Sequence, residues 1–143
     1  MAGAPPDVLK RVPLFAELSR KELGQVARLF KERRFQEGET IAREGSGGAA
    51  FFLIDSGQAS VSIRGEQRRT LRPGDYFGEI ALIDEGARSA TVTASSELAC
   101  WGLTFWDFRP LVQGNAEIAW KLLQSLAKKL RAAEDLAPSA REA

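Results

Sequence analysis

Three polar side chains lie close together in the segment FGEIALIDEGARSATV, residues 77–92. Glu79 follows a glycine, and Arg88 and Ser89 come after a short apolar turn. An arginine fork matches the oxygens of a phosphate, and a serine hydroxyl can donate to another of them. An ionised glutamate can only accept hydrogen bonds, for example from the hydroxyl of a sugar or from an arginine when the site is empty. These residue types describe a pocket for a phosphorylated sugar, and a purely structural Glu–Arg pair is the alternative that they leave open.

The backbone of the same segment can add to such a pocket. Residues 79–83 are predicted to form a short helical turn, whose first N–H groups lack internal partners and carry partial positive charge. Such N–H groups form an anion site without side chains. Gly78 would let a ligand approach the backbone closely, and residues 84–86 would end the turn before a strand over 90–94.

Composition excludes several kinds of chemistry. The chain of 143 residues has 20 basic and 19 acidic residues, so we expect no broad basic face for nucleic acid or for anionic membranes. It has no histidine and one cysteine, Cys100, which excludes Cys/His zinc sites, iron–sulfur clusters and histidine-dependent catalysis. The longest apolar run, AAFFLI, is too short to cross a bilayer. We therefore expect a cytoplasmic protein that is not an enzyme and holds no metal.

The middle of the chain has the pattern of a β structure. Between residues 33 and 104, short β-rich pieces alternate with glycines, and residues 58–64 alternate apolar and polar side chains. The sequences Asp55-Ser56-Gly57 and Arg64-Gly65-Glu66 are typical of hairpin turns. Many short strands at this spacing predict a small barrel or jelly roll.

Helices are predicted on both sides of the β region. Residues 18–30 have helical periodicity, and Ser19 and Glu22 form the pattern of a capping box. A short helix is predicted over residues 104–112, with Thr104 as its cap, and a longer one over 115–137.

The long helix carries two apolar stripes. Ile118 and Leu122 form one of them. The other repeats at spacings of three and four and consists of Ala116, Ala119, Leu123, Leu126, Leu130, Ala133 and Ala137. One stripe could pack on the barrel while the other meets the same helix of a second copy, which predicts a homodimer through residues 115–137. The alternative is a single wide stripe buried within one chain.

The order of the residues in the first segment resembles the phosphate-binding cassette of the cyclic nucleotide-binding domain family, in which FGE and a short turn precede R-[ST]-A-[ST]-V. Three further segments are similar to features of this family: VPLFAELS, EGETIAREG (37–45) and LRPGDYFGE. The resemblance runs from Val12 through the C-terminal helix. It implies a mainly β fold with flanking helices, an eight-stranded β-roll. The chain would be one domain with an N-terminal helical segment (12–32), the β-roll (33–104, cassette 77–92) and C-terminal helices (105–137).

The resemblance also implies roles for the cassette residues. Glu79 would accept a hydrogen bond from the ribose 2′-hydroxyl, and Arg88 would pair with the cyclic phosphate. Ser89 and the N–H groups of Ala81 and Ala90 would complete the phosphate shell. The ligand-binding set expected from the cassette is Gly78, Glu79, Ile80, Ala81, Arg88, Ser89 and Ala90.

The candidates for recognising the base of the nucleotide lie outside the cassette or at its edge. Leu71, Tyr76 and Ile63 are candidates for the base side, and barrel core is the alternative for all three. In bacterial regulators of the cAMP receptor protein type the C-terminal helix offers hydroxyl groups to adenine, whereas Glu134 here offers a carboxylate that could accept from an exocyclic amine. Arg131 could stack on the base, or it could simply be exposed to solvent.

The resemblance implies a regulatory function. In this family, a threonine directly after the cassette arginine is associated with cGMP preference. Here that position is Ser89, so we expect cAMP as the ligand and keep cGMP as the alternative. Binding would shift the C-terminal helix, and a dimer mate or an effector protein would read that change. No helix-turn-helix domain follows the helix in this sequence, so the output is expected in another protein or in a part of the gene product beyond this chain. A degenerate member of the fold, which binds no nucleotide and serves in dimerisation or docking, is the remaining alternative.

Overall fold

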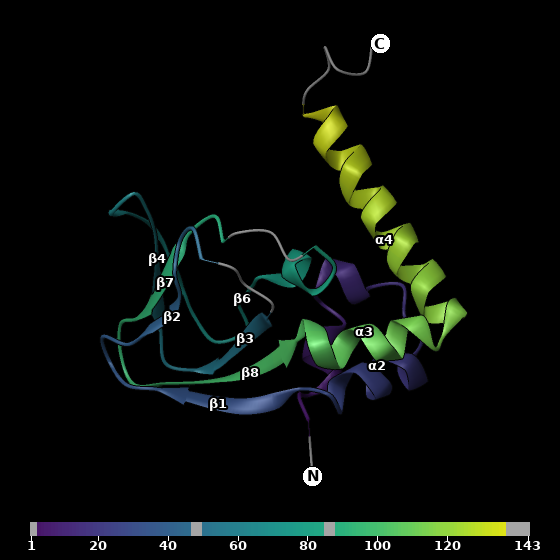
Figure 1. Cartoon of the computed structure of the whole chain (residues 1–143), viewed down its shortest axis with the longest axis horizontal. Coiled ribbons are helices and arrows are strands. Elements are labelled where there is room, and N and C mark those ends of the chain that lie inside the picture. Colours follow the sequence, from purple (N-terminus) through teal and green to yellow (C-terminus); the bar gives the residue numbers. More distant parts are fainter. Residues whose placement is uncertain (1–2, 47–49, 85–87, 137–143) are drawn as a thin grey trace.

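Two antiparallel sheets face each other and form a β-roll, which confirms the predicted fold class (Figure 1). The computed structural model describes residues 3–46, 50–84 and 88–136. Within these ranges the sheets have the strand orders β1-β8-β3-β6 and β2-β7-β4-β5. The strands are β1 (Lys31–Phe35), β2 (Thr40–Ala42), β3 (Ala50–Ser56), β4 (Ala59–Ile63), β5 (Glu66–Leu71), β6 (Tyr76–Phe77), β7 (Thr91–Ala94) and β8 (Leu98–Thr104).

The two predicted hairpin turns differ in outcome. Strands β4 and β5 pair with Ile63 opposite Glu66, so Arg64 and Gly65 form a two-residue turn, and their φ angles of 54° and 78° fit the mirror-image turns of hairpins. The prediction for residues 55–57 is wrong, because β3 and β4 belong to different sheets and the chain crosses between sheets here. A glycine is still needed at Gly57, where φ is 85° and a Cβ would collide with the carbonyl oxygen of Glu97.

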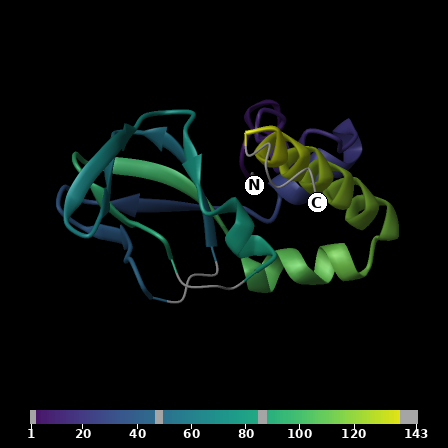
Figure 2. The ribbon, with the colours of Figure 1, turned by 90° about the horizontal axis from the view of Figure 1, so that it is seen from above.

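Helices gather at one end of the roll, and α4 rises from this end away from the sheets (Figures 1 and 2). They are α1 (Pro6–Leu9), the 3₁₀ helix η1 (Pro13–Phe15), α2 (Arg20–Ala27), the 3₁₀ helix η2 (Glu79–Leu82), α3 (Phe105–Gln113) and α4 (Ala116–Asp135). Figure 2 shows η2 between the roll and the helical end. None of the helices in the described part of the chain is long and apolar enough to span a bilayer.

The predicted helix starts are confirmed. The side-chain oxygen of Ser19 accepts from the N–H of Glu22, whose carboxylate accepts from the N–H of Ser19 at 2.8 Å, so the capping box is complete. Thr104 caps α3, and Asn115 caps α4 by accepting from the N–H of Ile118 at 3.1 Å. Helix α2 ends at Ala27 and is therefore shorter than predicted. Phe30 is buried in the core although it lies beyond the end of the helix, so its apolar character continued the helical spacing without continuing the helix. The predicted end of the long helix at Ala137 lies outside the described residues.

Strand β3 connects two apolar clusters. Phe51 and Leu53 pack into the cluster shared with the helices, whereas Phe52 and Ile54 pack into the cluster inside the roll. A strand buried on both faces needs no polar alternation, which explains the unbroken run AAFFLI. The same strand leads into the site, because Ala50 at its start contacts the cassette.

Candidate functional site

Arg88 is held at the centre of the cassette by its backbone and its side chain. Its N–H donates to the carbonyl of Ser46 at 2.9 Å, and its carbonyl accepts from the N–H of Gly45 at 2.9 Å. Its Nη2 donates to the carbonyl oxygen of Ala50 at 2.6 Å. Burial lowers the pKa of the Arg88 guanidinium from its ordinary value, which is the effect expected when a charge lies in a poorly solvated place. An anion beside this guanidinium would compensate for that lost solvation.

Gly78 makes room for that guanidinium. Its φ angle is 85°, and a Cβ built on it would lie 2.5 Å from Nη1 of Arg88 and 2.7 Å from the carbonyl oxygen of Ala50. Gly78 also caps the N-terminus of η2. The glycine is therefore required by the position of the arginine and by the left-handed backbone, whatever ligand approaches it.

A cavity of about 330 Å³ opens in front of Arg88. Its wall combines cassette residues with side chains of β2, β4, β5 and β7, and none of the described lining residues is acidic. They are Ala42, Val61, Ile63, Arg68, Arg69, Phe77, Gly78, Arg88, Ser89, Ala90 and Val92. The structure thus brings together Gly78, Arg88, Ser89, Ala90 and Ile63 of the predicted set.

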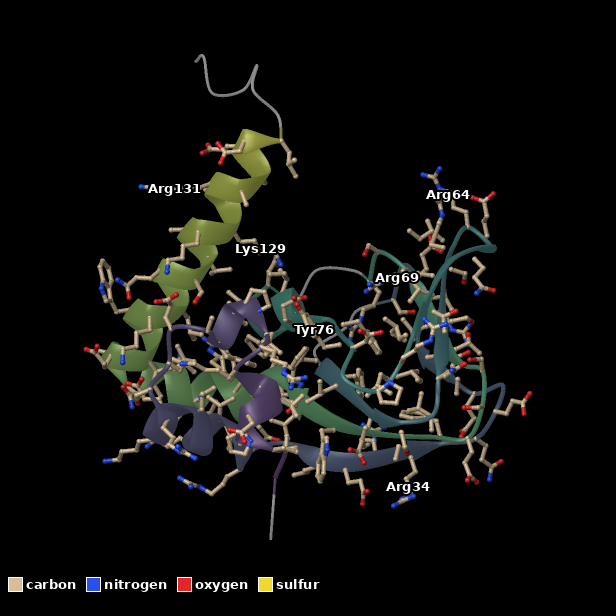
Figure 3. All side chains as sticks on the ribbon, turned by 180° about the vertical axis from the view of Figure 1, so that it is seen from behind. Arg34, Arg64, Arg69, Tyr76, Lys129 and Arg131 are labelled. Carbon is tan, nitrogen blue, oxygen red and sulfur yellow. The ribbon has the colours of Figure 1, made fainter. Side chains whose placement is uncertain are left out.

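Glu79 lies beside this cavity but is not part of its wall. Its Oε2 lies 3.7 Å from Nζ of Lys129 on α4, and 15% of its side chain is exposed. The expectation that Glu79 and Arg88 pair with each other in the empty site is wrong, because Arg88 bonds to Ala50 and Glu79 pairs with Lys129. Figure 3 shows Lys129 on the side of α4 that faces the roll.

Two other cassette residues differ from expectation. The N–H of Ala81 donates to the carbonyl of Gly78 at 3.0 Å, so it is already used within the 3₁₀ turn and is not free for a phosphate in this structure. A 3₁₀ turn closes its bonds between residues three apart, which engages this N–H one position earlier than an α-helix would. Ile80 is 41% exposed and does not line the cavity.

The candidates for base recognition are mostly outside the cavity. Ile63 lines it, but Leu71 is fully buried in the core of the roll, as its alternative assignment predicted. The ring of Tyr76 packs edge-on against Phe51 at 5.8 Å between centroids, and burial, followed by the charge of Glu79, raises its pKa.

Neither helical candidate reaches the cavity. Arg131 and Glu134 are exposed on α4, and Figure 3 shows Arg131 pointing away from the roll. The predicted lid over the base is therefore not formed in this structure.

Two arginines of the cavity wall, Arg68 and Arg69, were not identified from the sequence. They are consecutive in β5, and a regular strand would place them on opposite faces. The pairing of β4 with β5 shifts register here, since Val61 is opposite Arg69 and Ser62 is opposite Gln67. A bulge of this kind breaks the alternation, so both side chains reach one cavity. Arg68 also pairs with Glu66 at 3.4 Å, and Figure 3 shows Arg69 at the rim of the roll.

Comparison with protein families gives one match. Residues 32–115 match the family described as "Cyclic nucleotide-binding domain", and this range contains the strands of the roll except Lys31, together with all of α3.

Similar proteins include regulatory and kinase chains. The chain is 40% identical over 92 residues to a cAMP-dependent protein kinase regulatory subunit from Yarrowia lipolytica. The aligned segment covers 63% of this chain and 24% of that protein. It is also 40% identical over 109 residues to a cGMP-dependent protein kinase from Eimeria tenella. Here the aligned segment covers 75% of this chain and 11% of that protein. The chain thus spans well under two thirds of the length of these relatives.

A solved structure with a similar fold is the N-terminal domain of a transcriptional regulator from Streptomyces coelicolor A3(2). It superposes with a TM-score of 0.83 at 30% identity and covers 90% of this chain and 96% of that chain.

Proposed function

Because the chain belongs to the cyclic nucleotide-binding domain family, we propose that it is a cyclic nucleotide sensor that takes cAMP into the cavity beside Arg88. The observation that carries this proposal is the half-buried guanidinium of Arg88, which has only a carbonyl oxygen as its side-chain partner among the described residues. A cavity of about 330 Å³ is at the small end of ligand sites and suits a ligand of mononucleotide size.

The cyclic phosphate would lie against Arg88, Ser89 and the N–H of Ala90. A hydrogen bond to a charged group contributes about 1.5–3 kcal/mol, so Arg88 would be the largest single contributor. The apolar side chains of Val61, Ile63 and Val92 would contact the ligand away from the phosphate. Glu79 would accept from the ribose hydroxyl after turning its carboxylate from α4 toward the cavity.

Thermal unfolding with added nucleotide tests this function. A ligand at 100 times its dissociation constant stabilises the folded state by about 2.7 kcal/mol. We expect cAMP to raise the midpoint of unfolding and 5′-AMP, with its doubly charged acyclic phosphate, to raise it less. No shift with either cAMP or cGMP would contradict the proposal and would favour the degenerate docking module.

A second candidate ligand is cGMP, and Arg68 and Arg69 favour it. Guanine presents two acceptors, O6 and N7, on the edge where adenine presents one acceptor and one donor. An arginine has only donors, so it matches the guanine edge better. The relative from Eimeria tenella, named as a cGMP-dependent kinase, is consistent with this candidate. If cGMP binds more tightly than cAMP and Arg69→Gln removes that preference, cGMP is the ligand.

Nucleotide binding would be signalled to other proteins through α4. We propose that the chain acts as a non-catalytic regulatory module, that α4 moves on binding, and that a second copy or an effector reads the movement. The exposed side chains of Trp120, Leu123 and Leu130 on α4 support pairing with a second copy.

A further inference from the structure

The C-terminal half of α4 is weakly attached to the rest of the molecule. Residues 127–136 are all exposed, in contrast to Ile118, Leu122 and Ser125 in the first half. Two neighbouring lysines reach back from this exposed half. Nζ of Lys128 lies 2.6 Å from Oε2 of Glu17, near the N-terminal helices, and Lys129 pairs with Glu79 of the cassette.

Only the second of these ion pairs involves the nucleotide site. Glu79 is the acid expected to hold the sugar, yet its carboxylate is directed to Lys129 and does not line the cavity. To accept from a sugar hydroxyl, the carboxylate has to turn away from α4. We propose that Lys129 competes with the sugar for Glu79, so that nucleotide binding and this attachment of α4 exclude each other. This inference rests on the proposed function and adds a regulatory residue outside the cassette.

The size of the effect follows from the exposure of the pair. Lys129 has 52% of its side chain exposed, so solvent screens its interaction with Glu79. Exposed ion pairs of this kind contribute about 0.2–1 kcal/mol, which corresponds to at most about a fivefold change in an equilibrium constant. Lys129 would therefore tune the affinity and couple α4 to the ligand without preventing binding.

Calorimetric titration of Lys129→Gln with cAMP and cGMP tests the competition. We expect this variant to bind the preferred nucleotide up to about fivefold more tightly than the wild type, and Lys129→Arg to bind like the wild type. Salt screens the ion pair, so the advantage of Lys129→Gln should shrink between 50 mM and 500 mM NaCl.

Lys128→Gln is the matched control. It removes the same charge from the adjacent residue and also releases one attachment of α4, but it leaves Glu79 paired with Lys129. If the affinity rises equally in both variants, a looser helix is the cause and the competition is wrong. Unchanged or weaker binding by Lys129→Gln would also overturn it, and weaker binding would mean that Lys129 attracts the nucleotide.

Hydrogen exchange of the backbone amides in α4 gives a second readout. In the ligand-free protein, Lys129→Gln should speed exchange in the last two turns of α4 relative to the wild type. Saturating nucleotide should bring the wild type to the same rate, because it releases the same contact. A wild type that binds neither nucleotide would overturn the proposed function and this inference together. A wild type that binds, with affinity and exchange unaffected by Lys129→Gln, would overturn the inference alone.

Discussion

At the scale of single residues, Arg88 and Gly78 form one unit. The guanidinium occupies the space that a side chain on Gly78 would take, and its hydrogen bond to Ala50 ties the cassette to β3. The motif predicts an arginine for the phosphate and a glycine for close approach, whereas the structure adds that the glycine accommodates the arginine itself.

We expect Gly78→Ala to reduce both stability and nucleotide binding. An alanine at φ of 85° costs about 1–2 kcal/mol from its backbone alone, and here its Cβ would also meet Arg88 and Ala50. Urea unfolding measures the loss, and Gly74→Ala is the matched control, because Gly74 has φ of 94° and open space around its Cβ position. Equal losses in the two variants would show that the contact with Arg88 has no energetic consequence.

At the scale of the elements, the capping box of α2 also connects to α4. The carboxylate of Glu22 accepts from the N–H of Ser19 and, at 2.8 Å, from Nζ of Lys121. The pKa of Glu22 is lowered mainly by the hydrogen bond from Lys121 and, to a smaller extent, by the hydrogen bond from the N–H of Ser19. The sequence predicts the cap, but the partner on α4, 99 residues away, is visible only in the folded chain.

The lowered pKa predicts a dependence of stability on pH. The folded state holds the ionised Glu22 more strongly than the unfolded state, so its contribution is present above the unfolded pKa near 4.5 and is lost as the pH falls through the lower folded value. Glu22→Gln keeps a side chain that can cap but removes the charge. We expect the variant to be less stable than the wild type at pH 7 and the difference to shrink below pH 4, as measured by denaturant unfolding. A difference independent of pH would contradict this assignment.

The exposed leucines of α4 allow a direct test of the proposed homodimer. Leu123 is 56% and Leu130 62% exposed, whereas Leu122 is buried in the helical core. If the exposed stripe pairs two chains, replacing both Leu123 and Leu130 with Asp should convert a dimer into a folded monomer that is less stable, because dimerisation stabilises the folded chain; sedimentation and thermal unfolding measure the two effects. A monomeric wild type at high protein concentration would exclude this interface.

How far the sequence predicts the elements depends on the range of the interactions involved. The helix starts and the β4–β5 turn follow from neighbouring residues, and both are confirmed. The crossing between sheets after β3 depends on strand pairing far along the chain, and the bulge that turns Arg68 and Arg69 into one cavity depends on register. The same holds for Lys129, because its contact with Glu79 requires the placement of α4 against η2.

At the scale of the whole molecule, the cassette lies where the roll meets the helices. On the helical side of η2, Leu82 and Ile83 line an apolar cavity of about 550 Å³ together with residues of α3 and α4. On the other side the cassette lines the cavity of Arg88. The cassette contributes residues to both cavities, Gly78 and Arg88 to one and Leu82 and Ile83 to the other, so it is well placed to pass a change at the first cavity to the helices. This placement is consistent with the proposed shift of α4 between two populated positions.

The most direct test of nucleotide binding at Arg88 is calorimetric titration of the wild type and Arg88→Ala with cAMP and cGMP. We expect the wild type to bind one of them at one site per chain. Arg88→Ala should lose about 1.5–3 kcal/mol or more of binding free energy, because it removes the half-buried cation that we propose as the partner of the phosphate. Arg34→Ala, an exposed arginine remote from the cavity (Figure 3), should bind like the wild type. Affinity close to that of the wild type in a folded Arg88→Ala protein would contradict a phosphate site at this residue.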